Sequence, residues 1–270
     1  MRRALALVAL AGTLGCAGVH RYHPNVYSVD GDIRLGQQLQ KEVESDVVLL
    51  RLSALTQLVN AIGTRLRDSA TEPAFRLFPY TFHVVDSPEV NAFALPGGPI
   101  YVNSGLIELC DTEDELASVI AHEMSHVAAR HATEMLTTQN LTQLVLVAAI
   151  SVIPVPLPPI AWEGAKLGYV LGLLQYSRGK EAEADRLGLQ LVASAGYDPA
   201  QMADVFRKLS EQQRSLPSVV ERFFSSHPLT EDRMRDVEAR AAALPRPANA
   251  PVATARPSSF SQVNLMFAKD

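Results

Sequence analysis

The sequence has few cysteines, little net charge and no long apolar run, and each shortage excludes a class of protein. Only two cysteines occur in 270 residues, which is too few for a disulfide-held scaffold. The net charge of −5 is small and gives no electrostatic basis for binding nucleic acid, so we expect no nucleic-acid partner. Apolar residues make up 47% of the chain, which is enough to build a hydrophobic core.

The apolar stretches are too short to cross a membrane. Residues 144–153 are almost all apolar, but Pro154 ends the run and a spanning helix needs about 20 such residues. A second apolar run covers residues 167–174. Two interpretations of residues 144–174 stay open, namely a buried helical hairpin in the core or a mobile lid over the functional site.

The beginning of the chain has the pattern of a targeting segment, with two arginines, an apolar run and small residues up to Gly15. Because Cys16 follows directly, as in a bacterial lipoprotein signal, we predict a signal peptide over residues 1–15 and a membrane anchor through lipid on Cys16. Ala17 favours the outer membrane. The predicted localisation is the cell envelope, as an outer-membrane lipoprotein facing the periplasm, or as a soluble periplasmic protein if Cys16 carries no lipid. Cys110 is expected to be a small buried apolar residue.

The remaining sequence predicts one folded domain between two irregular segments. We expect a tether over residues 16–31, the domain over 32–244 and a disordered tail over 245–270. Alternating apolar residues predict a strand over 79–86, and a second strand is expected over 99–103 after a turn that contains Gly97 and Gly98. The fold class is therefore α+β, mostly helical with a small β-sheet. Expected helices cover residues 32–67, with a division at Gly36 or at 44–46, then 178–193, a segment from Asp198-Pro199, and about 230–244.

A stretch just after the predicted strands carries the strongest chemical signal. His122, Glu123 and His126 spell H-E-x-x-H, Thr112 and Glu115 form a capping box before them, and no glycine or proline follows until residue 154. We therefore expect a helix beside the sheet. Residues four apart share a helix face, so two imidazoles reach one zinc ion and Glu123 reaches a metal-bound water. The histidine pair alone also fits a surface pair or a structural metal clip.

A hydrolytic zinc site needs a third protein ligand. His131 lies five residues after His126, about 500° around the helix, so it is not expected to reach the same ion. Glu181 and Asp185 are four apart on the next long polar helix and share a face. We predict that Glu181 binds the metal and that Asp185 hydrogen-bonds a ligand histidine and fixes its tautomer. Glu183 faces away, and the alternative is that these acids only solvate the helix.

These motifs resemble the gluzincin family of zinc metallopeptidases that includes the CAAX prenyl protease, HtpX and the BepA-type periplasmic proteases. The similar stretches are H-E-x-x-H-V-A-A-R-H, S-R-x-x-E-x-E-A-D-x-x-G from Ser177, N-A-F with P-G-G, A-G-Y-D-P, and H-P followed by Arg233. The resemblance is closest to the short bacterial lipoprotein members. It implies one zinc ion per chain, bound by His122, His126 and Glu181, with Glu123 as general base.

The function that we expect is a zinc-dependent endopeptidase of the bacterial cell envelope. Its substrates would be unfolded or misassembled periplasmic and outer-membrane proteins, hydrolysed by a zinc-activated water. The alternative is a zinc-stabilised chaperone or assembly factor for outer-membrane proteins, in which Glu123 would have no required role.

Several further residues are candidates for the site. His227 is the predicted second electrophile, with Arg233 nearby behind the ligands. Two other roles for His227 stay open, namely a fourth zinc ligand that keeps the enzyme latent and an ordinary loop histidine. An extended substrate is expected to add a strand at the sheet edge near residues 99–103. The predicted substrate-binding residues are Asn91, Gly98 and Tyr101.

Overall fold

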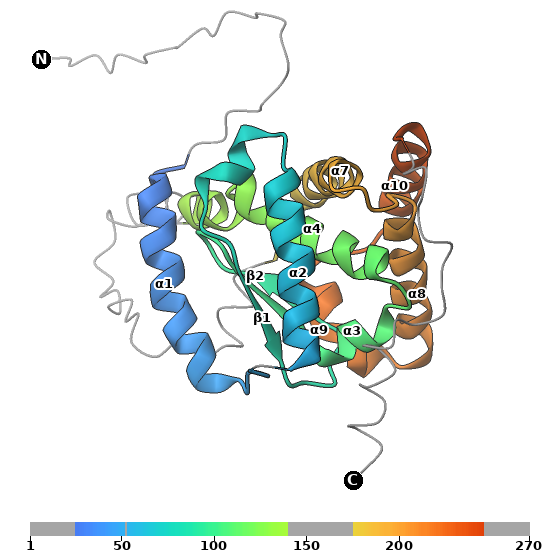
Figure 1. Cartoon of the computed structure of the whole chain (residues 1–270), viewed down its shortest axis with the longest axis horizontal. Coiled ribbons are helices and arrows are strands. Elements are labelled where there is room, and N and C mark those ends of the chain that lie inside the picture. Colours follow the sequence, from blue (N-terminus) through green and yellow to red (C-terminus); the bar gives the residue numbers. More distant parts are fainter. Residues whose placement is uncertain (1–24, 52, 140–174, 246–270) are drawn as a thin grey trace, which may run out of the picture.

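The computed structural model describes residues 25–51, 53–139 and 175–245, and it confirms the α+β class. Helices surround a small sheet (Figure 1). A helical stretch over residues 131–139 also belongs to the described part. The elements are α1 (Val29–Asp46), α2 (Ala54–Ser69), the 3-10 helix η1 (Pro73–Leu77), β1 (Thr81–Val85), β2 (Ala92–Ala94), β3 (Pro99–Asn103), α3 (Ser104–Leu109), α4 (Glu113–Ala128), α7 (Arg178–Ser194), α8 (Gln201–Ser215), α9 (Pro217–Ser226) and α10 (Glu231–Ala243).

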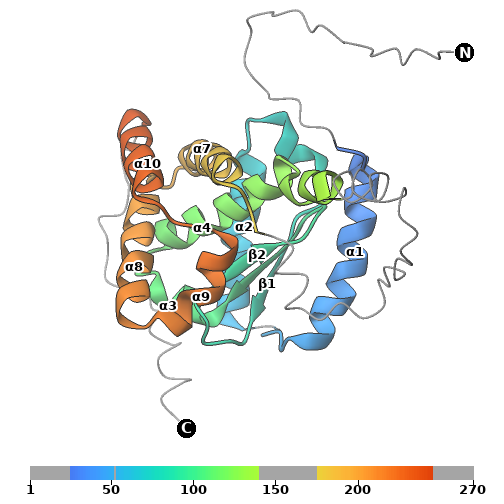
Figure 2. The ribbon, with the colours of Figure 1, turned by 180° about the vertical axis from the view of Figure 1, so that it is seen from behind.

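Helix α4, which carries the H-E-x-x-H motif, lies in the middle of the domain. It packs against α2, α7 and α8 and against strands β2 and β3. Every α4 residue from Asp114 to Ala128 is buried. Figure 2 shows α4 between α7 and the sheet, so the predicted position of the sheet beside this helix is confirmed.

The sheet has the strand order β1-β3-β2, with β3 parallel to β1 and antiparallel to β2. The stretch expected to be a turn therefore contains a strand, β2. All three residues of β2 are buried, so they show no alternation of apolar and polar side chains. The expectation that residues 99–103 form a sheet edge is wrong, because β3 is paired on both sides.

The two outer strands have different neighbours. The free side of β1 is partly covered, because the amide of Leu50 donates to Val84 and the amide of Asp86 donates to Val48. Strand β2 is the other edge, and it packs against α4. The sheet edge beside the H-E-x-x-H motif is therefore β2.

Helices α1 and α2 cover opposite faces of the sheet. Val59 and Ile62 of α2 belong to the larger core with α4, whereas Val43 of α1 packs in a second cluster with Phe93 and Tyr101. The predicted division near residues 44–46 is confirmed, since α1 ends at Asp46. Helix α2 packs against α4, whereas α1 packs on the sheet.

Two glycines allow α1 to approach the turn between β2 and β3. Gly97 has a φ of 77°, and an added Cβ there would lie 2.5 Å from the Cα of Ile33 on α1. Gly36 does not divide the helix as predicted. It stays helical, and a Cβ at this position would collide with the carbonyl oxygen of Pro96. The glycines therefore permit close packing.

Helix α4 ends at Ala128 although no glycine or proline follows it. Ala129 and Arg130 form a turn, in which Arg130 has a φ of 59°. The guanidinium of Arg130 donates to both carboxylate oxygens of the buried Asp32, at 2.6 and 3.1 Å, and to the carbonyl of Tyr27. These contacts offset the cost of left-handed backbone, about 1–2 kcal/mol. The turn is set by a contact with the N-terminal segment, which sequence spacing does not reveal.

The helices after residue 175 agree with the predictions from the sequence, except that α8 begins later and α9 is an additional helix. The predictions for 178–193 and 230–244 are confirmed by α7 and α10. Helix α8 begins at Gln201, later than predicted, because the Asp198 carboxylate accepts from the amide of Ala200 in a turn before the helix. Helix α9 was not expected, and its end places His227.

Several predictions fall on residues outside the described part, namely the signal peptide, Cys16, residues 144–174 and the tail from residue 246. Part of the predicted tether is described. The side chain of Asn25 and the amide of Val26 donate to Thr133 and Thr137, and α1 begins at Val29. Cys110 is buried with a free thiol. Across the described ranges, no helix has the length and apolar character needed to span a membrane.

Candidate active site

Helix α4 brings two histidines to one face. The hydroxyl of Thr112 accepts from the amide of Glu115 and caps the helix, as predicted. Nine residues of α4 precede His122, so the motif lies in the last two turns of the helix. His122 and His126 are both buried, and their Nε2 atoms are 3.0 Å apart. This separation confirms that the two imidazoles share a face.

Helix α7 supplies the carboxylate. Its cap is Ser177, and Glu181 lies one turn further, fully buried. Glu181 Oε1 is 3.4 Å from His126 Nε2, and Glu181 Oε2 is 3.5 Å from His122 Nε2. The structure therefore places Glu181 where the sequence predicts a third ligand.

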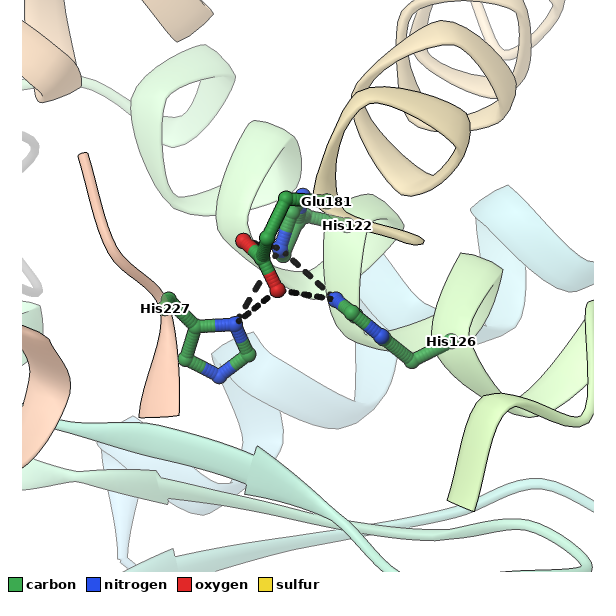
Figure 3. Close-up of side chains that lie close together, drawn as sticks. All are labelled: His122, His126, Glu181 and His227. Carbon is green, nitrogen blue, oxygen red and sulfur yellow. Dashed lines mark hydrogen bonds and ion pairs between the residues drawn. The ribbon is translucent and has the colours of Figure 1, made fainter. Parts of the chain in front are cut away.

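His227 completes the cluster from the end of α9. Its Nδ1 atom lies 3.4 Å from His122 Nε2 and 3.2 Å from Glu181 Oε1. Figure 3 shows the four side chains converging from α4, α7 and the segment after α9. His227 is 1% exposed, so it is not an ordinary solvated loop residue.

The spacing of these four side chains fits a tetrahedral ion. Zinc bonds of about 2.0–2.1 Å place tetrahedral ligand atoms about 3.3–3.4 Å apart. The donor atoms of His122, His126, Glu181 and His227 are separated by 3.0 to 3.5 Å along the pairs given above, and all four residues offer donor atoms within 4.8 Å of one another. Imidazole nitrogen and carboxylate oxygen are also the donors that zinc accepts. The residues present therefore fit the predicted metal.

In this buried cluster, pKa values reflect a balance between burial and contacts with neighbouring charged groups. Burial opposes the charge on His122, but hydrogen bonds to Asp185 and Glu181 outweigh it and raise the pKa of His122 to about 10. Burial would raise the pKa of Glu181, but the neighbouring His227, His122 and His126 hold it well below the usual value. Burial lowers the pKa of His126. The carboxylate thus remains an anion in the interior.

Glu123 lies between the cluster and strand β2. It is 1% exposed, and its carboxylate accepts a hydrogen bond from the backbone of Ala94. The other contact is that of Oε1, which lies 3.5 Å from His227 Nε2; this oxygen atom makes no hydrogen bond to any described residue. Burial raises the pKa of Glu123, which suits a group that takes up a proton.

Asp185 and Arg233 lie behind the cluster. Asp185 Oδ1 is 3.0 Å from His122 Nδ1, the ring nitrogen on the side away from the cluster. Arg233 donates to both oxygens of Asp185, at 2.8 Å each, and lies 2.6 Å from Glu181 Oε2. One guanidinium from α10 therefore holds both carboxylates of α7 in place.

Two contacting residues were not predicted. The ring of Tyr176 stacks on that of His126, with centroids 4.0 Å apart, and its amide donates to Ser226 beside His227. His131 Nδ1 lies 3.0 Å from His126 Nδ1, although helix periodicity places it elsewhere. Tyr176 directly precedes the S-R motif at Ser177, which is the one sequence signal that points to it.

The predicted substrate-binding residues lie on or beside the sheet. Asn91 precedes β2 and is buried, and its Oδ1 has no hydrogen-bond partner among the described residues. Gly98 belongs to the turn before β3, with a φ of 132°. Tyr101 on β3 is fully buried and stacks between His83 and Phe93. Within the described part of the chain, no hydrogen bond, ion pair or ring contact joins these three residues to the four-residue cluster, and their role stays a prediction.

The central helix with H-E-x-x-H, the glutamate from a following helix and the small sheet beside them are the features that the resemblance to gluzincins leads us to expect. The sequence model of Peptidase family M48 matches residues 54–241, and the chain belongs to this family. The family match begins after α1, so α1 lies outside it.

Named relatives agree with this family. A beta-barrel assembly-enhancing protease of Yersinia pestis is 34% identical over 220 residues, covering 79% of this chain and 44% of that protein. The metalloprotease LoiP of Escherichia coli K12 is 30% identical over 214 residues, covering 77% of this chain and 80% of LoiP. The mitochondrial metalloendopeptidase OMA1 of Schizosaccharomyces pombe is 30% identical over 218 residues, covering 79% of this chain and 62% of OMA1. The chain thus spans less than half the length of the beta-barrel assembly-enhancing protease.

Proposed function

We propose that this chain is a zinc-dependent endopeptidase with one zinc ion held by His122, His126 and Glu181. The observation that carries the proposal is the set of four buried residues whose donor atoms lie within 4.8 Å of one another, with the buried carboxylate of Glu123 beside them. Glu123 is not among the closely spaced donors. A purely structural metal site would therefore not require its buried carboxylate.

The roles of the protein groups follow from their positions. A bound zinc ion would lower the pKa of a water molecule and polarise the scissile carbonyl. Glu123 accepts the proton of the attacking water and passes it to the leaving amine. Asp185 holds the Nδ1 proton of His122, so that Nε2 keeps its lone pair for the metal. Arg233 holds Glu181 and Asp185 at fixed positions.

We assign substrate binding to the β2 edge. Strand β2 packs against α4, and the Ala94 backbone supports the carboxylate of Glu123. An extended peptide that pairs with β2 would therefore lie next to the general base. Backbone pairing favours unfolded or extended segments over a fixed sequence.

The geometry favours a latent role for His227 over the oxyanion role. Its Nδ1 lies 3.4 Å from His122 Nε2 and 3.2 Å from Glu181 Oε1, so it would serve as a fourth donor to a bound ion, in the place that a catalytic site keeps open for water. On this basis His227 must move before a substrate is cleaved. His227→Ala should then raise the rate of peptide cleavage. A fall in that rate would instead support a role for His227 in stabilising the oxyanion.

The natural substrates that we propose are unfolded or misassembled proteins of the cell envelope. The name of the relative from Yersinia pestis, a beta-barrel assembly-enhancing protease, supports this class of substrate. We retain the predicted attachment to the outer membrane through lipid on Cys16, facing the periplasm.

The decisive experiment is cleavage of an unfolded protein such as reduced casein, with wild type beside Glu123→Gln and zinc content measured in both. We expect wild type, or His227→Ala if wild type is latent, to cleave, and Glu123→Gln to bind zinc without cleaving. Removing a general base typically costs about 10²–10⁴ in rate. Equal cleavage by wild type and Glu123→Gln would overturn the mechanism, whereas zinc binding with no cleavage by any of the three forms would favour a chaperone.

A further inference from the structure

The two histidines of the motif each have a partner on the ring nitrogen that faces away from the cluster. For His122 the partner is the carboxylate of Asp185, at 3.0 Å from Nδ1. For His126 the partner is another imidazole, that of His131, with the two Nδ1 atoms also 3.0 Å apart. His131 is 1% exposed, so no bulk water competes for this contact.

The direction of the second hydrogen bond follows from proton counting. A neutral imidazole carries one N–H and one lone pair. If His126 uses its Nε2 lone pair for a metal, its proton is on Nδ1, and His131 Nδ1 must accept it. The proton of His131 is then on its Nε2, which lies 3.4 Å from Glu183 Oε2. The three side chains form a chain of donors that runs from His126 through His131 to Glu183.

The position of His131 depends on the turn after α4. In an uninterrupted helix, five residues correspond to about 500°, which would place His131 about 140° away from His126. The turn at Ala129 and Arg130 changes this direction. Arg130 holds the turn through its paired hydrogen bonds to Asp32, next to the start of α1. A segment outside the family match thus sets the direction of His131.

We propose that His131 is a positioning residue that fixes the tautomer and orientation of the metal ligand His126, with the Asp32–Arg130 pair holding His131 in place. The inference rests on metal binding by His126, as in the proposed function, but not on peptide cleavage. The partners of a ligand histidine typically change metal affinity by about 10–100-fold when removed.

The test is the zinc dissociation constant of the full chain, measured by competition with a chromophoric chelator. His131→Leu removes the acceptor and should weaken zinc binding about 10–100-fold. His131→Asn places its Oδ1 where the Nδ1 of histidine was, and should keep zinc binding within about threefold of wild type. His83→Leu is the matched control, because His83 lies on β1 and stacks on Tyr101 away from the cluster.

Two results would overturn the inference. One is unchanged zinc affinity in a folded His131→Leu, and the other is an equal loss in His131→Asn and His131→Leu, which would make shape and not hydrogen bonding the cause. Should His131→Leu fail to fold, the ¹⁵N NMR spectrum of the zinc-loaded wild type decides. We expect the proton on Nδ1 of His126 and on Nε2 of His131, and the opposite tautomers would overturn the inference.

The same measurements separate this inference from the proposed function. Failure of the wild-type chain to bind zinc would overturn both. Tight zinc binding that His131→Leu leaves unchanged would overturn the role of His131 alone.

Discussion

The two ligand histidines of α4 are held in different ways. His122 is backed by a carboxylate, Asp185, which is itself paired with the guanidinium of Arg233. His126 is backed by the neutral ring of His131, whose pKa burial lowers. A carboxylate raises the basicity of the histidine that it accepts from, whereas a neutral acceptor only orients it. The comparison indicates that the His122 side depends on charge and the His126 side on geometry.

The two sides also differ in which part of the chain they use. The His122 side uses Asp185 of α7 and Arg233 of α10, and both residues lie within residues 54–241 that match the family. The geometric side depends on the turn at Arg130 and on Asp32 of α1, and α1 lies outside that match. A substitution on the His122 side should therefore lower both the stability of the fold and the affinity for metal. A substitution on the His126 side should act mainly through the turn at Arg130.

The largest effect is expected from Arg233→Leu. It would leave the carboxylates of Glu181 and Asp185 buried without their common counterion, and breaking a buried ion pair typically costs about 3–5 kcal/mol. The measurement is urea unfolding of the zinc-free chain.

Arg235→Leu on the same helix provides the control for this substitution. Arg235 pairs with Asp232 at the exposed surface, so its loss should change the free energy of unfolding by at most about 0.5 kcal/mol. If both substitutions cost the same, charge does not hold the His122 side together.

A smaller effect distinguishes the two histidine partners directly. Asp185→Asn keeps an oxygen acceptor for His122 but removes the charge, so zinc binding should weaken about 10-fold. His131→Asn also keeps an acceptor, and because no charge is lost it should weaken zinc binding by less than about threefold. The measurement is again chelator competition. Equal losses for the two substitutions would remove the distinction between charge and geometry.

The part of the site that the sequence predicted is the part that helix periodicity controls. His122 and His126 are four apart on α4, Glu181 and Asp185 are four apart on α7, and all four lie where the 3.6-residue period places them. His227 was predicted as a candidate, but only the end of α9, a helix that the sequence did not indicate, brings it to ligand distance.

The parts that were missed depend on contacts between distant segments. Strand β2 is short and fully buried, so its pairing with β3 leaves no alternating pattern. No glycine or proline marks the end of α4. The helix ends there because Arg130 adopts left-handed backbone, which its hydrogen bonds to Asp32, 98 residues earlier, stabilise. His131 was predicted not to reach the ion, and it is not among the closely spaced donors, but its contact with His126 was missed because the helix was assumed to continue. Each error comes from treating a local pattern as complete where a distant residue decides the geometry.

The smallest effect concerns the turn that directs His131. Arg130→Gly and Arg130→Ala both remove the bonds to Asp32, so their difference isolates the backbone. At a φ of 59°, alanine bears the left-handed cost of about 1–2 kcal/mol, whereas glycine does not. Glycine loses more entropy on folding, by about 0.4–1 kcal/mol, which reduces the difference. We therefore expect Arg130→Ala to be less stable than Arg130→Gly by about 0.5–1 kcal/mol in urea unfolding. An Arg130→Ala chain as stable as Arg130→Gly would mean that the turn relaxes to a regular helix without the arginine. His131 would then point away from His126, and zinc binding should fall in Arg130→Ala by the amount expected for His131→Leu.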